Sequence, residues 1–415
     1  MALTSGEPAP VEQAVEVIRE RGVREAARQL AAGLRARLRH GELSILPVAL
    51  GLIVIWTFFE LRDPYFLTPR NMTNLILQIA VTGTIAIGVV LVLLLGEIDL
   101  SVGSVAGVTA AVLGILISVD HVAWWLAVLV MLGVGAAIGV FHGFWSAIVG
   151  VPSFVVTLAG LLGWLGFQLH VLGSLGTVNV VDPNILNLTT AFVPDYLGWV
   201  LAVAVSLLYA ATRALEGRRR SRNGLPAMPA TELAARTLGL AVLALLAVFV
   251  LNQWRGVPTA GLILLGLVLL FAWISGRTRY GRYIYAVGGN AEAARRAGVN
   301  VAAIRISVFM LCSLLAALGG LLAVSRGSAA GTQTGGGTLL LEAIAAAVIG
   351  GTSLFGGRGT VWAALLGALV IGSVSNGLDL TGEPADVKYI VQGGILLLAV
   401  TIDAFSRRGR AAAGR

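Results

Sequence analysis

Long apolar runs alternate with short polar segments over most of the chain, and many of these runs have the length of a membrane crossing. A helix of about 20 apolar residues spans the hydrocarbon core of a bilayer, and shorter or tilted helices are also found. The pattern predicts twelve such helices, near residues 43–59, 75–95, 98–118, 122–149, 154–173, 195–214, 237–254, 258–275, 306–324, 339–355, 360–378 and 386–402. Because twelve is even, both chain termini are expected on the same side of the membrane.

The composition agrees with this pattern. Hydrophobic residues make up 57% of the 415 residues and charged residues only 12%, whereas the surface of a water-soluble protein needs a larger share of charge. The sequence therefore predicts an all-α polytopic membrane protein. Its single cysteine, Cys312, excludes an intrachain disulfide, and its four histidines lack the spacing of metal ligands, so we expect no metal site.

The basic residues predict the orientation of these helices. With the N-terminus inside, the cytoplasmic segments hold 24 of the 29 lysines and arginines, as the positive-inside rule requires. We therefore expect both termini in the cytoplasm. The formal net charge of +8 is then explained by loops that face anionic lipid and the cytoplasm, and no nucleic acid partner is expected.

The two ends of the chain carry part of this basic charge. Residues 1–42 contain seven arginines and several glutamates before the first apolar run, which does not fit a secretory signal peptide. Apolar residues recur there at mostly helical spacing, so we interpret the segment as an amphipathic helix on the inner leaflet, with a partly disordered basic tail as the alternative. Residues 406–415 are expected to form a basic cytoplasmic tail.

Several polar residues lie at membrane depth, where they need an explanation. The run 96–104 places Glu97 and Asp99 between two apolar spans, and a charge at mid-membrane costs roughly 2.5–3.5 kcal/mol on insertion scales. The pair therefore indicates a turn, a water-filled cavity or a pathway. Packing and pathway roles are equally open for the other polar candidates, which are Gln78, Ser101, Glu342, Asn376 and Gln392.

The longest polar segment between spans is residues 276–305, on the predicted cytoplasmic side. Asn290 is a favourable N-cap, Glu292 lies where a helix N-terminus favours an acid, and Gly298 can end the helix after Arg295 and Arg296. The segment thus predicts a short helix that suits docking into a cleft of another protein, with an ordinary solvated loop as the alternative. The chain contains no G-x-x-x-x-G-K-[ST] motif, so we expect no nucleotide-binding loop in it.

Four ordered motifs carry a resemblance to a known family. Residues 97–104 (EIDLSVGS), 151–160 (VPSFVVTLAG), the loop 281–301 and residues 343–354 (AIAAAVIGGTSL) resemble the permease subunit of monosaccharide ABC importers of the ribose, arabinose and xylose type. The resemblance covers about residues 45–405. Many members have Gly-Gly where this chain has Gly96-Glu97, and this chain carries an additional hairpin at about 195–254; both features resemble D-xylose permeases. Ten core helices plus this hairpin give the twelve predicted crossings, some of them broken or re-entrant.

The resemblance implies a function and a set of partners. Residues 43–405 would form the transmembrane domain of a homodimeric permease in a bacterial inner membrane. It would receive a monosaccharide, D-xylose, from an extracytoplasmic binding protein and move it into the cytoplasm. ATP and Mg would be held by a separate ATPase subunit, so this chain is expected to be no enzyme and to hold no cofactor.

The resemblance also assigns roles to the candidate residues. The loop 276–305 would present a coupling helix to the ATPase, formed by Gly289, Asn290, Glu292, Ala293, Ala294, Arg295, Arg296 and Gly298. The translocation pathway would draw on Gln78, Glu97, Asp99, Ser101, Glu342, Asn376 and Gln392. No catalytic residue is expected.

Two other classes of membrane protein were weighed. An ion-coupled secondary sugar transporter with twelve spans should have similar halves, but here the turn after the second span is acidic and the loop after the eighth is long and basic. A membrane enzyme would need a cluster of nucleophile, base and metal ligands, which the polar segments do not suggest. The ATP-driven permease is therefore the favoured interpretation, with the secondary transporter as the alternative.

Overall fold

The computed structural model describes residues 45–225 and 229–412, so the predicted amphipathic segment 1–42 lies outside the described part of the chain. The chain divides into the units Met1–Leu50 and Gly51–Arg415, and all helices and strands after α2 (Ile45–Arg62) lie in the second unit.

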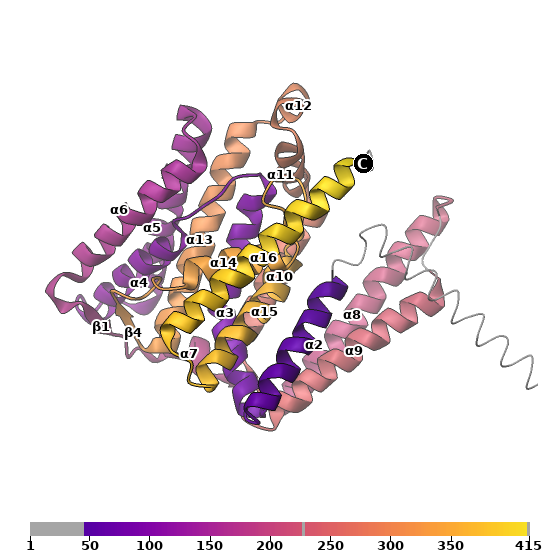
Figure 1. Cartoon of the computed structure of the whole chain (residues 1–415), viewed down its shortest axis with the longest axis horizontal. Coiled ribbons are helices and arrows are strands. Elements are labelled where there is room, and N and C mark those ends of the chain that lie inside the picture. Colours follow the sequence, from indigo (N-terminus) through magenta and orange to yellow (C-terminus); the bar gives the residue numbers. More distant parts are fainter. Residues whose placement is uncertain (1–44, 226–228, 413–415) are drawn as a thin grey trace, which may run out of the picture. The chain divides into compact units, whose positions relative to one another are not determined.

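Nearly all regular structure is α-helical, which confirms the predicted fold class (Figure 1). In chain order the helices are α2 (Ile45–Arg62), α3 (Pro69–Leu94), α4 (Val102–Ser118), α5 (Trp124–Phe144) with the π-helix η1 (Trp145–Val149), α6 (Ser153–Leu172) with the 3-10 helix η2 (Gly173–Leu175), α7 (Pro183–Thr190), α8 (Asp195–Arg222), α9 (Ala230–Asn252), α10 (Thr259–Arg277), α11 (Arg279–Gly289), α12 (Ala291–Arg296), α13 (Val301–Gly327), α14 (Leu339–Ile349), α15 (Trp362–Leu380) and α16 (Ala385–Ala412). Two short antiparallel sheets pair β1 (Thr177–Asn179) with β4 (Ala329–Gly331) and β2 (Phe192–Val193) with β3 (Val257–Pro258).

The lengths of these helices test the predicted crossings. Within the described residues, eight helices are long and apolar enough to cross a membrane by length and composition: α3, α5 with η1, α6, α8, α9, α10, α13 and α15. Helices α4 and α14 are apolar but have only 17 and 11 residues. The total of twelve crossings remains a prediction.

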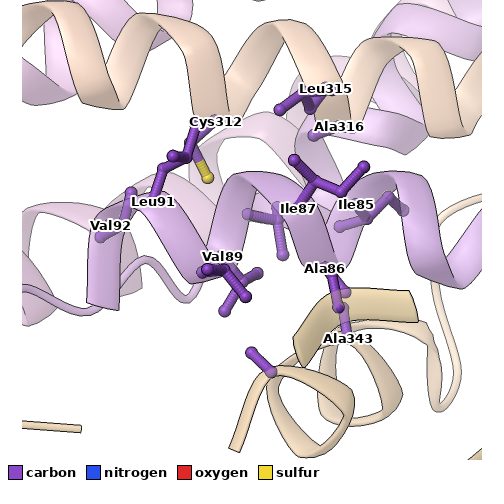
Figure 2. Packing of buried hydrophobic residues seen from close by; sticks show 14 of the residues in the cluster. Ile85, Ala86, Ile87, Val89, Leu91, Val92, Cys312, Leu315, Ala316 and Ala343 are labelled. Carbon is purple, nitrogen blue, oxygen red and sulfur yellow. The ribbon is translucent and has the colours of Figure 1, made fainter. Parts of the chain in front are cut away.

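Helix α3 is the centre of the core. Of its most apolar 18-residue window, 83% is buried. Figure 2 shows its residues Ile85 to Val92 between Cys312, Leu315 and Ala316 of α13 on one side and Ala343 of α14 on the other. A helix that is apolar on all sides is stable among other helices or in lipid, and α3 is surrounded by other helices.

Glycines allow the helices to approach closely where no hydrophobic force joins them in lipid. On α5, Gly135, Gly139 and Gly143 fall every four residues along one face, and a Cβ atom at Gly139 or Gly143 would clash with the backbone of α13. The two helices therefore pack nearly backbone to backbone.

The segment after α13 is a broken span. The chain leaves α13, pairs β4 with β1, and then runs as irregular backbone along α4, where a Cβ atom at Gly103 would lie 2.6 Å from the carbonyl oxygen of Gly335. Gln168 of α6 satisfies part of this backbone by donating to the carbonyls of Gly331 and Thr334 at 2.8 and 2.9 Å. Irregular backbone at membrane depth is tolerated when protein buries it in this way. The predicted span 339–355 is thus a half-helix, since the 11 residues of α14 cover only about 16 Å.

Helices α8 and α9 form an antiparallel hairpin with little burial (Figure 1). Only 17% of the apolar window of α8 and 6% of that of α9 are buried. Their aliphatic side chains are therefore available to lipid along most of the hairpin.

Candidate functional site

Glu342, in the first turn of α14, gathers polar groups from four elements. Its Oε1 accepts hydrogen bonds from Thr338 Oγ1 at 2.9 Å, Gln392 Nε2 at 2.9 Å and Ser375 Oγ at 3.2 Å. Its Oε2 accepts from Thr82 Oγ1 of α3 at 3.3 Å. These residues are called the Glu342 cluster below.

The local fold explains why a glutamate is stable at this position. It lies at the N-terminus of the half-helix α14, where the exposed backbone N–H groups favour an acid. Thr338, the N-cap residue, donates its hydroxyl to Glu342, and its side-chain oxygen accepts no capping hydrogen bond from a backbone N–H of the helix. The carboxylate is thus fixed at the point where the irregular backbone ends and the half-helix begins.

Two features of the cluster suit the binding of a polar solute. Glu342 is only half-buried, and a partly exposed carboxylate at membrane depth faces water or protein in preference to lipid. Gln392 is 6% exposed, and its Oε1 atom has no hydrogen-bond partner within the described ranges. The cluster therefore places an unpaired acceptor, itself shielded from solvent, beside a half-buried carboxylate.

Two other predicted residues lie outside this set of hydrogen bonds. Gln78 is half-buried on α3, one helical turn before Thr82 and so on the same face. Asn376 of α15 pairs with Asn71 of α3 through two amide hydrogen bonds of 2.7 and 3.1 Å, and both residues are buried. This amide pair joins α3 and α15. The amide donors and acceptors that a solute would need are used in the hydrogen bonds between the two asparagines.

Asp99 belongs to a second, sealed set of polar groups, called the Asp99 network. Its carboxylate is 2% exposed, and Oδ1 accepts from Ser101 N at 2.8 Å and Ser101 Oγ at 2.6 Å, which fixes the turn before α4. The Ser101 hydroxyl lies 3.4 Å from Nδ1 of His142 on α5, and Nε2 of this histidine accepts from Trp164 Nε1 of α6 at 2.9 Å. Asp99 and Ser101 thus tie α4 to α5 and α6.

Glu97 points elsewhere, although it is only two residues from Asp99. Its Oε1 lies 3.0 Å from Arg305 NH2, in the second turn of α13, and the two side chains are 14% and 28% exposed. The two carboxylates that the sequence places side by side therefore have different partners, and neither contacts the Glu342 cluster through a hydrogen bond recorded for the described residues.

The short helix predicted after Asn290 is present as α12, at the end of α11 and before α13 (Figure 1). Asn290 Oδ1 accepts from Ala293 N at 2.9 Å, as an N-cap does, and Gly298 follows the helix with a φ of +84°. Among the residues proposed for this helix, Ala294 is buried against the bundle, whereas Gly289, Ala293 and Gly298 are exposed.

The charges of α12 are exposed and paired with one another. Glu292 forms ion pairs with Arg295 at 2.8 Å and Arg296 at 3.1 Å, and the three side chains are 54%, 65% and 79% exposed. Exposed pairs of this kind contribute little to stability. The helix therefore presents charges that a partner protein can reach.

Several residues of the site were not singled out from the sequence. Thr82, Thr338 and Ser375 are isolated hydroxyls within apolar or glycine-rich runs, which carry no periodic signal. The sequence also did not indicate Arg305, which contacts the turn before α4, or Gly288, which contacts the end of α3. A basic residue just inside a predicted span could have indicated the need for an acidic partner such as Glu97.

Comparisons with known proteins place this chain in a family. Residues 71–400 match the family described as "Branched-chain amino acid transport system / permease component". The chain is 37% identical over 375 residues to the xylose transport system permease protein XylH of Escherichia coli strain K12, covering 89% of this chain and 94% of that protein. It is 34% identical to the ribose import permease protein RbsC of the same strain, over 85% of this chain and 92% of that protein. It is 30% identical to the fructose import permease protein FrcC of Rhizobium meliloti, over 89% and 87%. No solved structure matches.

Proposed function

This chain belongs to the family of transport-system permease components, and we propose that it is the membrane subunit of an ATP-driven importer that carries xylose into the cytoplasm. The observation that carries the proposal is the 37% identity to a xylose permease over 89% of the chain. The family description names branched-chain amino acids, but the relatives named above are sugar permeases. A monosaccharide is therefore the substrate class that we favour.

The Glu342 cluster supports a route for a sugar. A monosaccharide has many hydroxyl groups and no charge, so it needs directional donors and acceptors. Glu342 and the free Oε1 of Gln392 are acceptors, and Thr338 and Ser375 add hydroxyls. In this proposal the half-exposed side of the cluster faces a pathway between two copies of the chain.

The proposal that this chain is the permease of an ATP-driven importer also implies its partner proteins. An extracytoplasmic binding protein delivers the sugar, and α12 docks into an ATPase subunit that holds ATP and Mg. Both termini and α12 lie in the cytoplasm, as the distribution of arginines indicates, and the protein resides in the bacterial inner membrane.

Reconstitution in vesicles tests this function. The permease, its ATPase and its binding protein are incorporated together, and uptake of labelled xylose is measured with and without ATP and with an uncoupler. We expect uptake that needs ATP and ignores the uncoupler. Uptake that continues without ATP and stops with the uncoupler would instead support an ion-coupled secondary transporter.

A variant of α12 tests the docking role separately. Glu292→Arg removes both ion pairs of this helix and reverses its charge, while stability should change little because the pairs are exposed. We expect an inserted permease that no longer couples xylose uptake to ATP hydrolysis. Normal uptake and normal sugar-stimulated ATPase activity in this variant would show that α12 is not the docking helix.

A further inference from the structure

The segment that contains α12 makes one contact with the last residue of α3 and one with the turn between α3 and α4, residues 95–101. On the α11 side, Gly288 lies so close to the end of α3 that a Cβ atom there would overlap the carbonyl oxygen of Leu94. That same carbonyl accepts from Gly357 N at 2.9 Å. On the α13 side, Arg305 forms its ion pair with Glu97. The two contacts flank α12 in the sequence, one before it and one after it.

The Glu97–Arg305 ion pair differs from the other ion pairs of the described residues. Most of those join residues three or four positions apart in one helix, and only the pairs Arg277–Glu216 and Lys388–Asp379 share with it a wide sequence separation. In both of those, one side chain is more than half exposed, whereas Glu97 and Arg305 are 14% and 28% exposed. A pair shielded from water is sensitive to distance and direction, whereas exposed pairs are weak and adaptable.

The turn 95–101 is connected to other helices by hydrogen bonds. Ile98 N donates to Ser153 Oγ at 3.3 Å and Leu100 N donates to Thr157 Oγ1 at 3.1 Å, so both hold the start of α6. Asp99 and Ser101 continue the contact to α4 and to His142 of α5. A displacement of Glu97 therefore reaches three helices through hydrogen bonds of 2.8 to 3.4 Å.

We propose that the Glu97–Arg305 ion pair is the link through which movement of α12 and α13 is passed to the turn 95–101, and from there to α4, α5 and α6. The proposal rests on the proposed docking of α12 to an ATPase. The close backbone contact between Gly288 and Leu94 leaves no room for these two segments to slide past each other. Gly288 is therefore the fixed point of the movement. Glu97 and Arg305 are thus positioning residues, and neither is part of the sugar pathway.

Neutral and reversed variants test the link. Glu97→Gln and Arg305→Gln each remove one charge, and the double variant Glu97→Arg with Arg305→Glu restores a pair of opposite sign. We expect each single variant to copurify with the ATPase but to transport roughly fivefold less xylose per ATP, the lower end of typical coupling effects. The reversed double variant should recover most of this ratio, which a loss of stability alone would not predict.

The exposed pair Arg277–Glu216 provides the matched control. Arg277→Gln also removes one arginine from an ion pair between helices, and the ratio of xylose to ATP should stay at its wild-type value. Should a neutral variant of the Glu97–Arg305 pair fail to reach the membrane, Arg305→Lys keeps the charge with a different donor geometry and should lower the ratio partially.

The possible failures are distinguishable. If the wild-type complex shows no ATP-dependent xylose uptake, the proposed function is wrong. If the wild type is active and the single variants keep the wild-type ratio, or the reversed pair folds and restores nothing, the ion pair is not the link. Either result leaves the proposed function standing and overturns this inference.

Discussion

The Asp99 network and the Glu342 cluster both place a carboxylate among membrane helices, but they differ in access. Asp99 is 2% exposed, and its Oδ1 atom holds the backbone and hydroxyl of Ser101 within one turn. Glu342 is half-buried and accepts hydrogen bonds from side chains of α3, α15 and α16, besides the N-cap residue of its own helix. The Asp99 carboxylate is shielded from solvent, with its Oδ2 atom unpaired among the described residues, whereas Glu342 keeps a partly exposed side.

This difference teaches how to interpret acids at membrane depth. A carboxylate among membrane helices is costly in either role, so the cost alone does not separate a structural role from a transport role. The distinction lies in the partners. A buried carboxylate that caps its own turn stabilises the fold, whereas a partly exposed one that collects side chains from separate helices can bind a polar solute.

The largest effect is expected from Asp99→Leu. This change removes the acceptor of two Ser101 donors in a buried turn, and each unsatisfied buried donor costs about 1–3 kcal/mol. We expect a large fall in the yield of folded permease and in its melting temperature in detergent. Asp99→Asn keeps an oxygen at the Oδ1 position and should retain most of the folded protein and of the xylose uptake.

Two outcomes would contradict this assignment of Asp99. A Leu variant as stable as the Asn variant would show that the carboxylate does not hold the turn. A well-folded Asn variant without transport would place Asp99 in the pathway or, together with uncoupler sensitivity, in a proton relay.

Glu342→Ala should affect transport more than folding. The cluster loses its shared acceptor, and a hydrogen bond to a charged group contributes about 1.5–3 kcal/mol, so xylose uptake should fall by roughly tenfold to a hundredfold. The melting temperature should fall less than in Asp99→Leu because the open side admits water. Glu342→Gln keeps one acceptor and should give intermediate uptake. If Glu342→Ala destabilised the protein and left the uptake per folded molecule unchanged, the cluster would be structural.

The contrast between the two regions could be predicted from the sequence only in part. Long apolar runs predicted most helices correctly, and Asn290 with Gly298 predicted α12, because these signals are local. The broken span before α14 was missed as such, since residues 332–338 resemble an ordinary loop until α4 and Gln168 are seen to cover them. Glu97 and Asp99 were read as one pair because no local pattern shows that their side chains have partners on different helices.

The members of the Glu342 cluster illustrate the same limit. Glu342 and Gln392 could be selected because a charge or an amide within an apolar span is unusual. Thr82, Thr338 and Ser375 could not, since isolated hydroxyls are common in membrane helices and often bond to their own backbone. Only the packing of α3, α15 and α16 around α14 brings them together.

Thr82→Val should have a smaller effect on the same cluster. Valine has nearly the shape of threonine but removes the donor that lies 3.3 Å from Glu342, and one such bond contributes about 0.5–1.5 kcal/mol. We expect the KM for xylose uptake to rise by roughly twofold to tenfold. Thr84→Val is the matched control, because the Thr84 hydroxyl bonds to the Ala80 carbonyl of its own helix. If the two substitutions had equal effects on KM, the hydrogen bond from Thr82 to Glu342 would have no specific role in uptake.

The smallest effect on both regions is expected from removing the hairpin of α8 and α9. β2 and β3 pair directly, Val193 with Val257, so deletion of residues 195–254 leaves Pro194, Arg255 and Gly256 as a three-residue loop between paired residues. Gly256 already has a φ of +93°, a conformation that such loops use. The deletion loses the stacking of Arg70 on Trp254 but few buried contacts.

The deletion variant should therefore retain at least about half of wild-type uptake, because lightly buried elements contribute little to the stability of the rest.

Removing two predicted crossings should also leave the sidedness of α12 unchanged. An Ala297→Cys substitution reports this, since position 297 is exposed and Cys312 is buried. A membrane-impermeant thiol reagent should label it in inside-out vesicles and not in intact cells. Labelling from outside the cell would refute the even number of crossings in this hairpin. Loss of xylose uptake in the deletion variant would show that the Asp99 network and the Glu342 cluster depend on the hairpin.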